Sequence, residues 1–239
     1  MALTLLDLTL PTLAENLALD EALLLDAEEE IGGEHLRFWE WPSAAVVLGA
    51  GGRLAADVDQ DACQREGIPL QRRASGGGTV LVGKGCLLFS LILRFDRDSS
   101  LKDVNASYRH ILSRVVDALR TIVPAERMGI SDLAVNGNKF SGNAQQRKRD
   151  HLLHHGTLLY DFDLPAIARY LRHPEKQPDY REGRSHDSFV TNLPADAGQL
   201  KQLLIEEWQP DQLATTYPVE RVAALVAEKY ERSDWVSRR

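Results

Sequence analysis

Apolar residues recur at helical spacing in several stretches of the chain. In the stretch 15–30, Leu17 and Leu24 fall on one face, and Gly32-Gly33 ends the predicted helix. The stretch 108–122 shows the same periodicity and ends before Pro124. The same criterion predicts further helices over 56–66, 167–171, 196–207 and 218–231.

Short β-rich runs alternate with these helices and predict strands. They cover 36–41, 45–48, 79–82, 86–93, 133–135, 139–141 and 152–160. The turn Gly83-Lys84-Gly85 predicts a hairpin between the third and fourth runs, and Asn136-Gly137 is a strong signal for a second one. Hairpins flanked by helices predict an α+β fold with a mixed, mainly antiparallel sheet.

The composition is that of a globular protein. A chain of 239 residues, 44% hydrophobic and 26% charged, is long enough to bury a core and is not disordered, collagen-like or a coiled coil. Its net charge of −7 argues against nucleic-acid binding. The two cysteines, Cys63 and Cys86, are too few for a disulfide framework or a cysteine-based zinc site. Without an apolar run of ~20 residues or a basic signal sequence, we expect a cytoplasmic protein with no membrane partner.

The sharpest chemical signal is a glycine-rich turn at 72–79. Arg72 and Arg73 precede Ser75, and three glycines follow directly. Consecutive glycines let backbone N–H groups converge on an anion, and guanidinium groups bind carboxylates and phosphates. The turn is neither a P-loop nor a dinucleotide-binding fingerprint. It therefore indicates an anion-binding turn, the alternative being a flexible hairpin turn with solvated arginines.

Two further clusters lie downstream. The predicted hairpin around Asn136-Gly137 would hold Asp132 and Lys139 across a tight turn, as a functional pair or as an ordinary surface ion pair. His151, His154 and His155 lie within five residues, which is a hint of a metal site. However, strand alternation puts His154 and His155 on opposite faces, and no carboxylate pattern accompanies them. We expect structural histidines beside a substrate pocket.

In this order, the three clusters resemble the motifs of the lipoate–protein ligase A family, within the biotin/lipoate ligase catalytic-domain superfamily. They read Arg-Arg-x-Ser-Gly-Gly-Gly, then Asp followed by Lys-x-Ser-Gly-x-Ala, then His-His-Gly-Thr-Leu-Leu. Residues 228–230 and 234–235 show a weaker resemblance to the same family. The resemblance implies one catalytic domain over 1–239, with a motif core at about 16–163, a helical and irregular extension at about 164–239, and no accessory C-terminal domain.

Members of that family activate lipoate or octanoate with ATP to an acyl-adenylate, and pass the acyl group to a lysine of a carrier domain. The resemblance therefore implies ATP and Mg²⁺ as cofactors, and as partners the lipoyl-carrier domains of 2-oxoacid dehydrogenase E2 or the glycine cleavage H protein. Lys139 resembles the family's essential lysine, and Asp132 would lie near the adenylate, holding the magnesium ion or the incoming amine. The residues implied in substrate or cofactor binding are Arg72, Arg73, Ser75, Gly76, Gly77, Gly78, Val80, Ser141, Gly142, His155, Gly156, Thr157, Leu17 and Leu153.

The sequence also departs from the ligase pattern. Val82-Gly83 and Gly85-Cys86 stand where the ligases have His-Asp and Gly-Asn, and Gln145-Gln146 replace an aromatic residue and an arginine. Some relatives without the accessory domain need a separate partner chain. Others are ATP-independent octanoyl or lipoyl transferases with a cysteine nucleophile, for which Cys86 is the candidate here, although its apolar run is typical of a buried, inert thiol.

Three functions therefore stay open: the ligase, the ATP-independent transferase, and a non-catalytic ligand-binding relative. Biotin ligation is disfavoured, because the glycine-rich turn and the histidine run look like the lipoate branch. The basic and aromatic stretch 172–186 would form a lid or dock an acidic carrier domain, or else is a surface linker. The basic run 147–149 would serve the same docking role, or is a solvated charge run.

Overall fold

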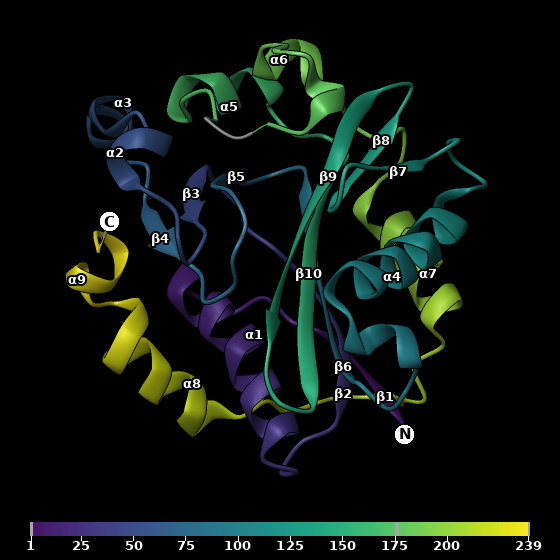
Figure 1. Ribbon diagram of the computed structural model, residues 1–239. Helices are drawn as coiled ribbons and strands as arrows, with labels where there is room; N and C mark the ends of the chain where they lie inside the picture. Colours follow the sequence, from purple (N-terminus) through teal and green to yellow (C-terminus); the bar gives the residue numbers. More distant parts are fainter. Residues whose placement is uncertain (1, 175–176, 239) are drawn as a thin grey trace.

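The computed structural model describes residues 2–174 and 177–238. Among these residues, eight strands form a large sheet: β1 (Leu3–Asp7), β2 (Glu34–Glu40), β6 (Cys86–Arg94), β7 (Glu126–Met128), β8 (Asp132–Val135), β9 (Asn138–Arg147), β10 (His151–Leu159) and β11 (Gln212–Leu213). Their order is β11-β1-β2-β6-β10-β9-β8-β7 (Figure 1). β1 pairs in parallel with β2 and β11, and the other pairs are antiparallel, so the predicted mixed, mainly antiparallel sheet is confirmed.

A smaller sheet lies beside the large one. It consists of β3 (Ala45–Leu48), β4 (Leu70–Arg72) and β5 (Val80–Val82), with β3 in the middle. The helices of the described chain are α1 (Leu13–Glu28), α2 (Leu54–Asp57), α3 (Gln60–Glu66), α4 (Val104–Leu119), α5 (Leu164–Tyr170), α6 (His186–Phe189), α7 (Ala197–Trp208), α8 (Val219–Leu225) and α9 (Ser233–Val236). Short 3₁₀ turns at Ser99–Lys102 and Asp179–Arg181 and a π-helical turn at Val226–Tyr230 complete the secondary structure.

The large sheet is covered on both faces. In β10, Leu153 and Leu159 point into a core formed with α1 and the small sheet, whereas Leu152 and Leu158 point into a core formed with α4 and α7. Figure 1 shows α1 on one side of the sheet and α4 with α7 on the other. This alternation follows from the two-residue period of a strand. No helix of the described residues is both long enough and apolar enough to cross a membrane.

One predicted hairpin is wrong. The runs at 79–82 and 86–93 do not pair with each other: β5 pairs with β3, while β6 pairs with β2 and β10. The glycine turn between them carries the chain from the small sheet to the large one. Gly85 has φ +83°, and a Cβ there would lie 2.0 Å from the carbonyl oxygen of Asp161. The turn is therefore built for close backbone packing against the end of β10, not for pairing its neighbours.

The predicted helix 56–66 is in fact two short helices. The chain leaves α2 at Val58, and Asp59 starts α3 by accepting a hydrogen bond from the backbone N–H of Ala62 at 2.9 Å. The backbone N–H of Asp59 meanwhile donates to the carbonyl of Tyr170. An N-cap and a tertiary hydrogen bond thus interrupt a segment whose apolar spacing predicted one helix.

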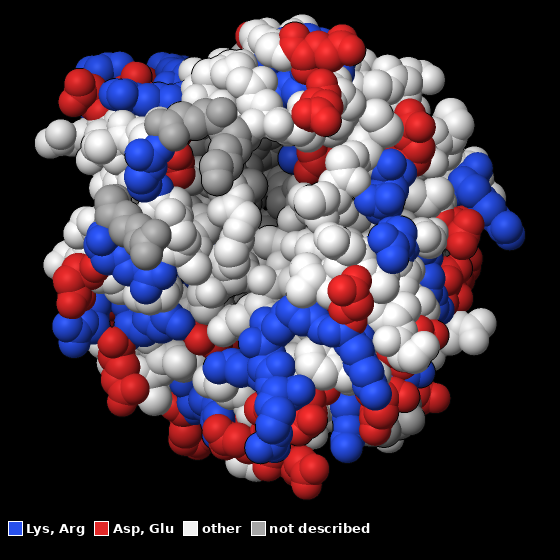
Figure 2. Space-filling view, viewed as in Figure 1, with Lys and Arg blue, Asp and Glu red and all other residues white. Residues whose placement is uncertain are grey.

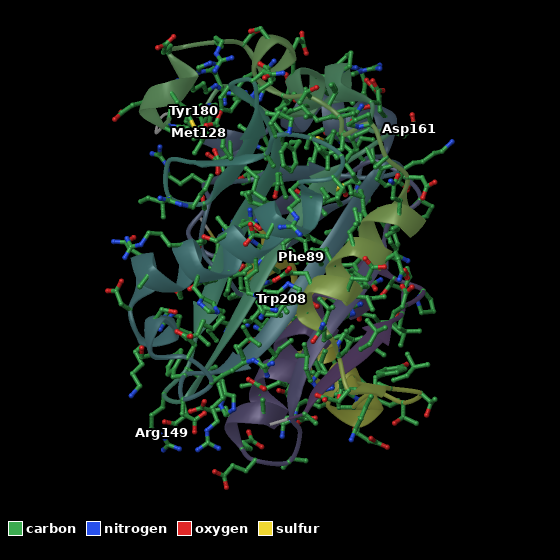
Figure 3. The ribbon with its side chains drawn as sticks, turned by 90° about the vertical axis from the view of Figure 1, so that its right-hand side faces the viewer. Phe89, Met128, Arg149, Asp161, Tyr180 and Trp208 are labelled. Carbon is green, nitrogen blue, oxygen red and sulfur yellow. The ribbon has the colours of Figure 1, made fainter. Side chains whose placement is uncertain are left out.

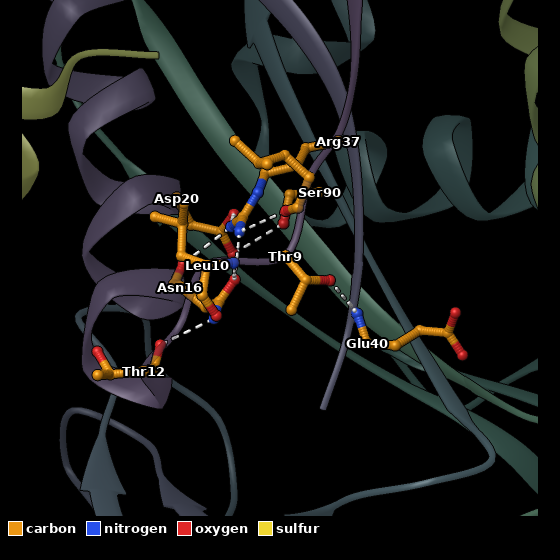
Figure 4. Close-up of polar contacts among 9 residues, drawn as sticks. Thr9, Leu10, Thr12, Asn16, Asp20, Arg37, Glu40 and Ser90 are labelled. Atoms are coloured by element: carbon orange, nitrogen blue, oxygen red, sulfur yellow. Dashed lines mark hydrogen bonds and ion pairs between the residues drawn. The ribbon is translucent and has the colours of Figure 1, made fainter. Parts of the chain in front are cut away.

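Helix α1 is anchored by a buried polar network (Figure 4). Thr12 and Glu15 form a capping box at its start. Arg37 of β2 is fully buried, and its guanidinium donates to Asp20 Oδ1 at 2.6 Å and to Asn16 Oδ1 at 2.8 Å. The hydroxyl of Ser90 on β6 donates to the other oxygen of Asp20 at 2.9 Å. These bonds fix the helix over β2 and β6 and set one wall of the site.

Candidate active site

Lys139 and Asp132 form an ion pair across the β8–β9 turn. Asn136 and Gly137 both adopt positive φ, at 51° and 75°, as a two-residue hairpin turn requires, and the second predicted hairpin is confirmed. Lys139 Nζ donates to Asp132 Oδ1 at 2.7 Å. The aspartate is largely buried, whereas 28% of the lysine side chain is exposed to solvent. The pair is therefore more than a solvated surface contact, and its ammonium group still reaches open space.

Tyr180, from the stretch 172–186, completes this group. Its hydroxyl donates to Asp132 Oδ2 at 2.8 Å, so both oxygens of the aspartate are engaged. Burial and the neighbouring carboxylate raise the pKa of Tyr180, so the phenol stays protonated and the hydrogen bond persists. The described part of the stretch therefore lies against the end of β8. Residues 175 and 176 of the stretch lie outside the described residues.

Arg73 holds the glycine-rich turn in shape. Its guanidinium donates to Ser75 Oγ at 3.0 Å and to the carbonyls of Gly76 and Gly78 at 2.6 and 2.8 Å. Gly77 has φ +84°, which favours glycine. Burial lowers the pKa of Arg73 to about 10, so the group stays charged at neutral pH. Its hydrogen-bond partners in the described chain are one hydroxyl and backbone carbonyls, so the turn carries a buried, uncompensated positive charge.

The turn and the lysine line one cavity of about 150 Å³. Gly77 and Gly78 of the turn, and Lys139 with Asp132 of the β8–β9 hairpin, all contribute to its wall. Figure 2 shows a hollow on this face between the positions of β5 and β9 in Figure 1, walled mainly by uncharged side chains. An anion in this cavity would meet both the glycine turn and the ammonium group.

The rest of the cavity wall mixes apolar and polar side chains, among them Asp20, Arg73 and His155. Its apolar members come from α1 and both sheets, namely Leu17, Trp39, Val47, Val80, Val82, Leu88, Phe89 and Ala144. The interior thus combines charged groups with eight apolar side chains. It suits a molecule that joins an anionic group to a hydrocarbon chain, because each buried methylene contributes about 0.8 kcal/mol.

His154 and His155 lie on opposite faces of β10, as predicted. His155 Nε2 lies 2.5 Å from Ser75 Oγ and lines the cavity. His154 is buried on the other face, where its ring contacts Tyr108 edge-on and its Nδ1 lies 3.1 Å from the Gln145 amide. Burial lowers the pKa of His154 to about 3, and burial together with Arg73 lowers that of His155 well below the usual value. Both rings are neutral at pH 7.

Three other residues of the histidine and lysine motifs also reach the cavity: Gly142, Gly156 and Thr157. At Gly156 a Cβ would lie 1.9 Å from Asn143 Oδ1, so the strand tolerates only glycine there. Leu153 lies beside the main cavity, in a smaller one that it shares with Leu17 and Ser75.

Four predicted site residues do not line either cavity. Arg72 turns away from the turn and donates to the carbonyls of Gly49, Gly52 and Val236. Ser141 is buried and accepts a hydrogen bond from the Asn143 amide. Gly76 contributes only its carbonyl, to Arg73.

Cys86, the remaining one, is fully buried in the core on the α1 side of the sheet, and burial raises its pKa. A thiol that is inaccessible and protonated at neutral pH is a poor nucleophile. Its place in the core matches the alternative of a buried, inert thiol. The structure gives no support to the role of Cys86 as a nucleophile.

Several wall residues were missed by sequence reasoning. Trp39 and Asn143 line the main cavity, Asp20 and Glu21 reach the site from α1, and Tyr230 reaches it from near the C-terminus. Nothing local in the sequence marks Trp39, because aromatic residues usually belong to the core. Tyr230 falls in the weak motif match at 228–230, but the sequence did not assign it to the site.

The described residues hold no preformed cluster of metal-ligating side chains. Among them, no group of three or more His, Cys, Asp or Glu side chains converges on one point. Asp132 lines the cavity, and its two oxygens already accept hydrogen bonds from Lys139 and Tyr180. A magnesium ion on a nucleotide needs only one or two protein carboxylates, so the Mg²⁺ role of Asp132 stays a prediction.

Comparison with known families assigns the chain. The family model of the lipoyl protein ligase A/B catalytic domain matches residues 12–214. The chain belongs to this family. The resemblance seen in the three motifs is thus confirmed, and the matched range contains the lysine pair, the glycine turn and the histidine run.

Relatives within this ligase family carry two kinds of name. The Mycoplasma pneumoniae protein named "Probable lipoate-protein ligase A" is 35% identical over 159 residues, which cover 65% of this chain and 45% of that protein. The Clostridioides difficile "Octanoyltransferase LipM" is 29% identical over 189 residues, which cover 71% of this chain and 69% of that protein. The chain thus matches less than half the length of the Mycoplasma relative.

Solved structures of lipoate ligases share the fold. A bi-partite lipoate protein ligase of Thermoplasma acidophilum, described with its E2 lipoyl domain, superimposes with a TM-score of 0.83 at 24% identity, covering 99% of this chain and 96% of that chain. A T. acidophilum protein with bound lipoic acid gives 0.84 at 23% identity and 99% and 100% coverage. A lipoate-protein ligase A bound with ATP gives 0.82 at 23% identity, covering 99% of each chain.

Proposed function

We propose that this chain activates lipoate or octanoate with ATP and transfers the acyl group to a lysine of a lipoyl-carrier domain. The observation that carries the proposal is a cavity lined together by Lys139, by Gly77 and Gly78, and by apolar side chains. The names of the family relatives and the ligands of the structural neighbours, lipoic acid and ATP, support the same substrates.

The first step would join the acyl carboxylate to the nucleotide. A carboxylate oxygen attacks the α-phosphorus of ATP, a C–O–P linkage forms, and the bond to pyrophosphate breaks. Negative charge builds up on the phosphoryl oxygens, and Lys139 is the exposed ammonium group in the cavity wall that can stabilise it. The glycine turn can add backbone N–H groups, in a shape that Arg73 maintains.

The second step would deliver the acyl group to its acceptor. The lysine amine of the carrier attacks the acyl carbonyl carbon, an amide bond forms, and AMP leaves with the electrons of the broken C–O bond. The incoming lysine arrives as an ammonium ion; it gives one proton to solvent before it attacks as a neutral amine, and a second to solvent as the amide forms. Asp132 lines the cavity together with Lys139, so we assign it the binding of that ammonium group. No step is assigned to a magnesium ion.

The carrier partners follow from the same proposal. An E2 lipoyl domain accompanies the Thermoplasma ligase, and that ligase is described as bi-partite. We therefore propose lipoyl domains as acceptors, and a separate accessory chain as a further partner for this chain. The basic run 147–149 is a weak docking candidate, because Arg147 is bound to the carbonyls of Leu101 and Lys102, and Arg149 lies at the opposite end of the molecule from Tyr180 (Figure 3).

ATP-independent octanoyl transfer is the second candidate, because the chain is also similar to proteins named octanoyltransferase LipM. In that reaction the acyl group would first move to a cysteine of the enzyme. Cys86 and Cys63 are both buried in this structure. The burial of both thiols favours the ligase.

One assay separates these functions. The full chain is incubated with lipoate or octanoate, ATP and an apo lipoyl domain, and the carrier mass and AMP are followed. Acyl transfer that depends on ATP supports the ligase, and Cys86→Ala should retain it. ATP-independent transfer from an octanoyl-carrier protein, lost in Cys86→Ala, would establish the transferase instead. If neither lipoate nor octanoate raises the Tm and no turnover is seen, with or without a candidate accessory chain, the protein is a non-catalytic relative.

A further inference from the structure

A second, smaller cavity adjoins the main one. Its volume is about 10 Å³, against about 150 Å³ for the main cavity. Four side chains line both spaces: Leu17, Asp20, Arg73 and His155. The two cavities are therefore neighbouring parts of one interior. Lys139 lines only the main cavity, and Tyr230 lines only the small one.

The far wall of the small cavity comes from the C-terminal part of the chain. Tyr230, at the end of the π-helical turn, lines this space and is 1% exposed. Its hydroxyl donates to Glu21 Oε2 at 2.8 Å, and Lys229 Nζ donates to both oxygens of Glu21, each at 2.8 Å. The tyrosine is thus clamped to helix α1.

The contacts of Glu21 with Tyr230 and Lys229 persist at neutral pH. Burial and the Glu21 carboxylate raise the pKa of Tyr230 well above its usual value, so its hydroxyl remains a donor. Lys229 is itself held, because its ammonium group lies 4.4 Å from the ring centre of Trp235. An ion pair, a phenol hydrogen bond and an aromatic contact therefore all keep the ring of Tyr230 in one place.

We infer that Tyr230 is the end-stop of the acyl cavity and sets the longest chain that the protein accepts. The inference rests on the proposed function, which puts the acyl carboxylate beside Lys139. From there the chain runs along Leu17 toward the small cavity, where the clamped ring blocks it.

The test is direct binding of fatty acids to the full chain by isothermal titration calorimetry, without ATP. Hexanoate, octanoate, decanoate and dodecanoate are compared on wild type and on Tyr230→Ala. We expect wild type to bind octanoate best. In Tyr230→Ala, two further methylenes gain room, so decanoate should bind about tenfold more tightly than it does to wild type. Tyr230→Phe keeps the ring and should keep the wild-type length profile.

Tyr170→Ala is the matched control. Tyr170 is also buried and donates to a glutamate, Glu66, at 2.6 Å, but it lines neither cavity. In Tyr170→Ala, the dependence of affinity on acyl-chain length should equal that of wild type. If Tyr230→Ala does not fold, Tyr230→Leu is judged by the same criterion.

The outcomes separate the two proposals. Octanoate binding by wild type with an unchanged length profile in the folded Tyr230 variant overturns the end-stop alone. An equal gain in decanoate affinity in Tyr170→Ala also overturns the end-stop, because the gain would then come from a general loss of packing. Failure of wild type to bind any of the acids overturns the proposed function, and the end-stop with it.

Discussion

The hydroxyl of Tyr180 donates a hydrogen bond to Asp132 Oδ2 at 2.8 Å, while Oδ1 of the same carboxylate accepts one from Lys139. The two contacts come from segments 41 residues apart in sequence, the β8–β9 hairpin and the 3₁₀ turn Asp179–Arg181 (Lys139 to Tyr180). Through this bridge, a residue that does not line the cavity controls the position of the ammonium group that does.

Tyr180→Phe should therefore slow turnover without unfolding the protein. Loss of a hydrogen bond to a charged acceptor costs about 1.5 kcal/mol, which corresponds to roughly a tenfold fall in kcat/KM. The measurement is the rate of ATP-dependent carrier acylation. Tyr160→Phe is the control, since that phenol donates to Glu40 at 2.6 Å away from the cavity. Equal effects of the two variants would rule out a positioning role for Tyr180.

Lys139→Ala should abolish adenylate formation. The variant removes the ammonium group that lines the cavity together with the glycine turn, and preorganised charge of this kind is worth about a hundredfold or more in rate. Pyrophosphate release in the presence of acyl acid and ATP reports this step alone. Lys201→Ala is a suitable comparison, because Lys201 pairs with Asp7 on the surface. Retention of even a tenth of wild-type activity in Lys139→Ala would refute the assigned role.

Arg72→Ala should destabilise the fold. The buried guanidinium ties the 49–52 turn to the carbonyls of the C-terminal helix α9, so its removal leaves several buried acceptors without a donor. We expect a loss of about 3 kcal/mol and a fall in Tm of about 6–12 °C. Thermal unfolding measures this, with Arg149→Ala as the surface control, its side chain being 81% exposed. A Tm change of under about 1 °C for Arg72→Ala would contradict the anchoring role.

Stability should fall as the pH drops from about 6.5 toward 5. Burial lowers the pKa of both His154 and His155, so in this window the unfolded chain binds protons that the folded protein does not. Each histidine then contributes a loss of up to about 1.4 kcal/mol per pH unit. Denaturant unfolding at a series of pH values measures the slope, which should be shallower in His155→Gln. Parallel slopes for the variant and wild type would contradict the burial of a neutral ring.

The sequence predicted the local pieces of the site well. The Asn136-Gly137 turn, with its two positive φ angles, set the register that places Lys139 by Asp132, and strand alternation separated His154 from His155. The hairpin predicted around Gly83-Lys84-Gly85 failed because a turn signal does not say which strands pair. In the folded chain Gly85 packs against the backbone of Asp161, and its neighbouring strands join different sheets.

The sequence also could not distinguish the roles of the adjacent residues Arg72 and Arg73. Arg72 and Arg73 read alike in the sequence, but consecutive side chains of an extended segment point to opposite sides. One therefore anchors the C-terminal helix, and the other shapes the glycine turn.

By itself, the amino-acid sequence determined the mixed sheet, the three motifs and their family, because these depend on turn chemistry, residue spacing and alternation along the chain. Only the tertiary structure decided that Cys86 is enclosed in the core, that Tyr180 reaches Asp132 and that Tyr230 closes the far cavity. Those contacts join segments tens to hundreds of residues apart. They depend on how the helices and sheets pack, which no local pattern records.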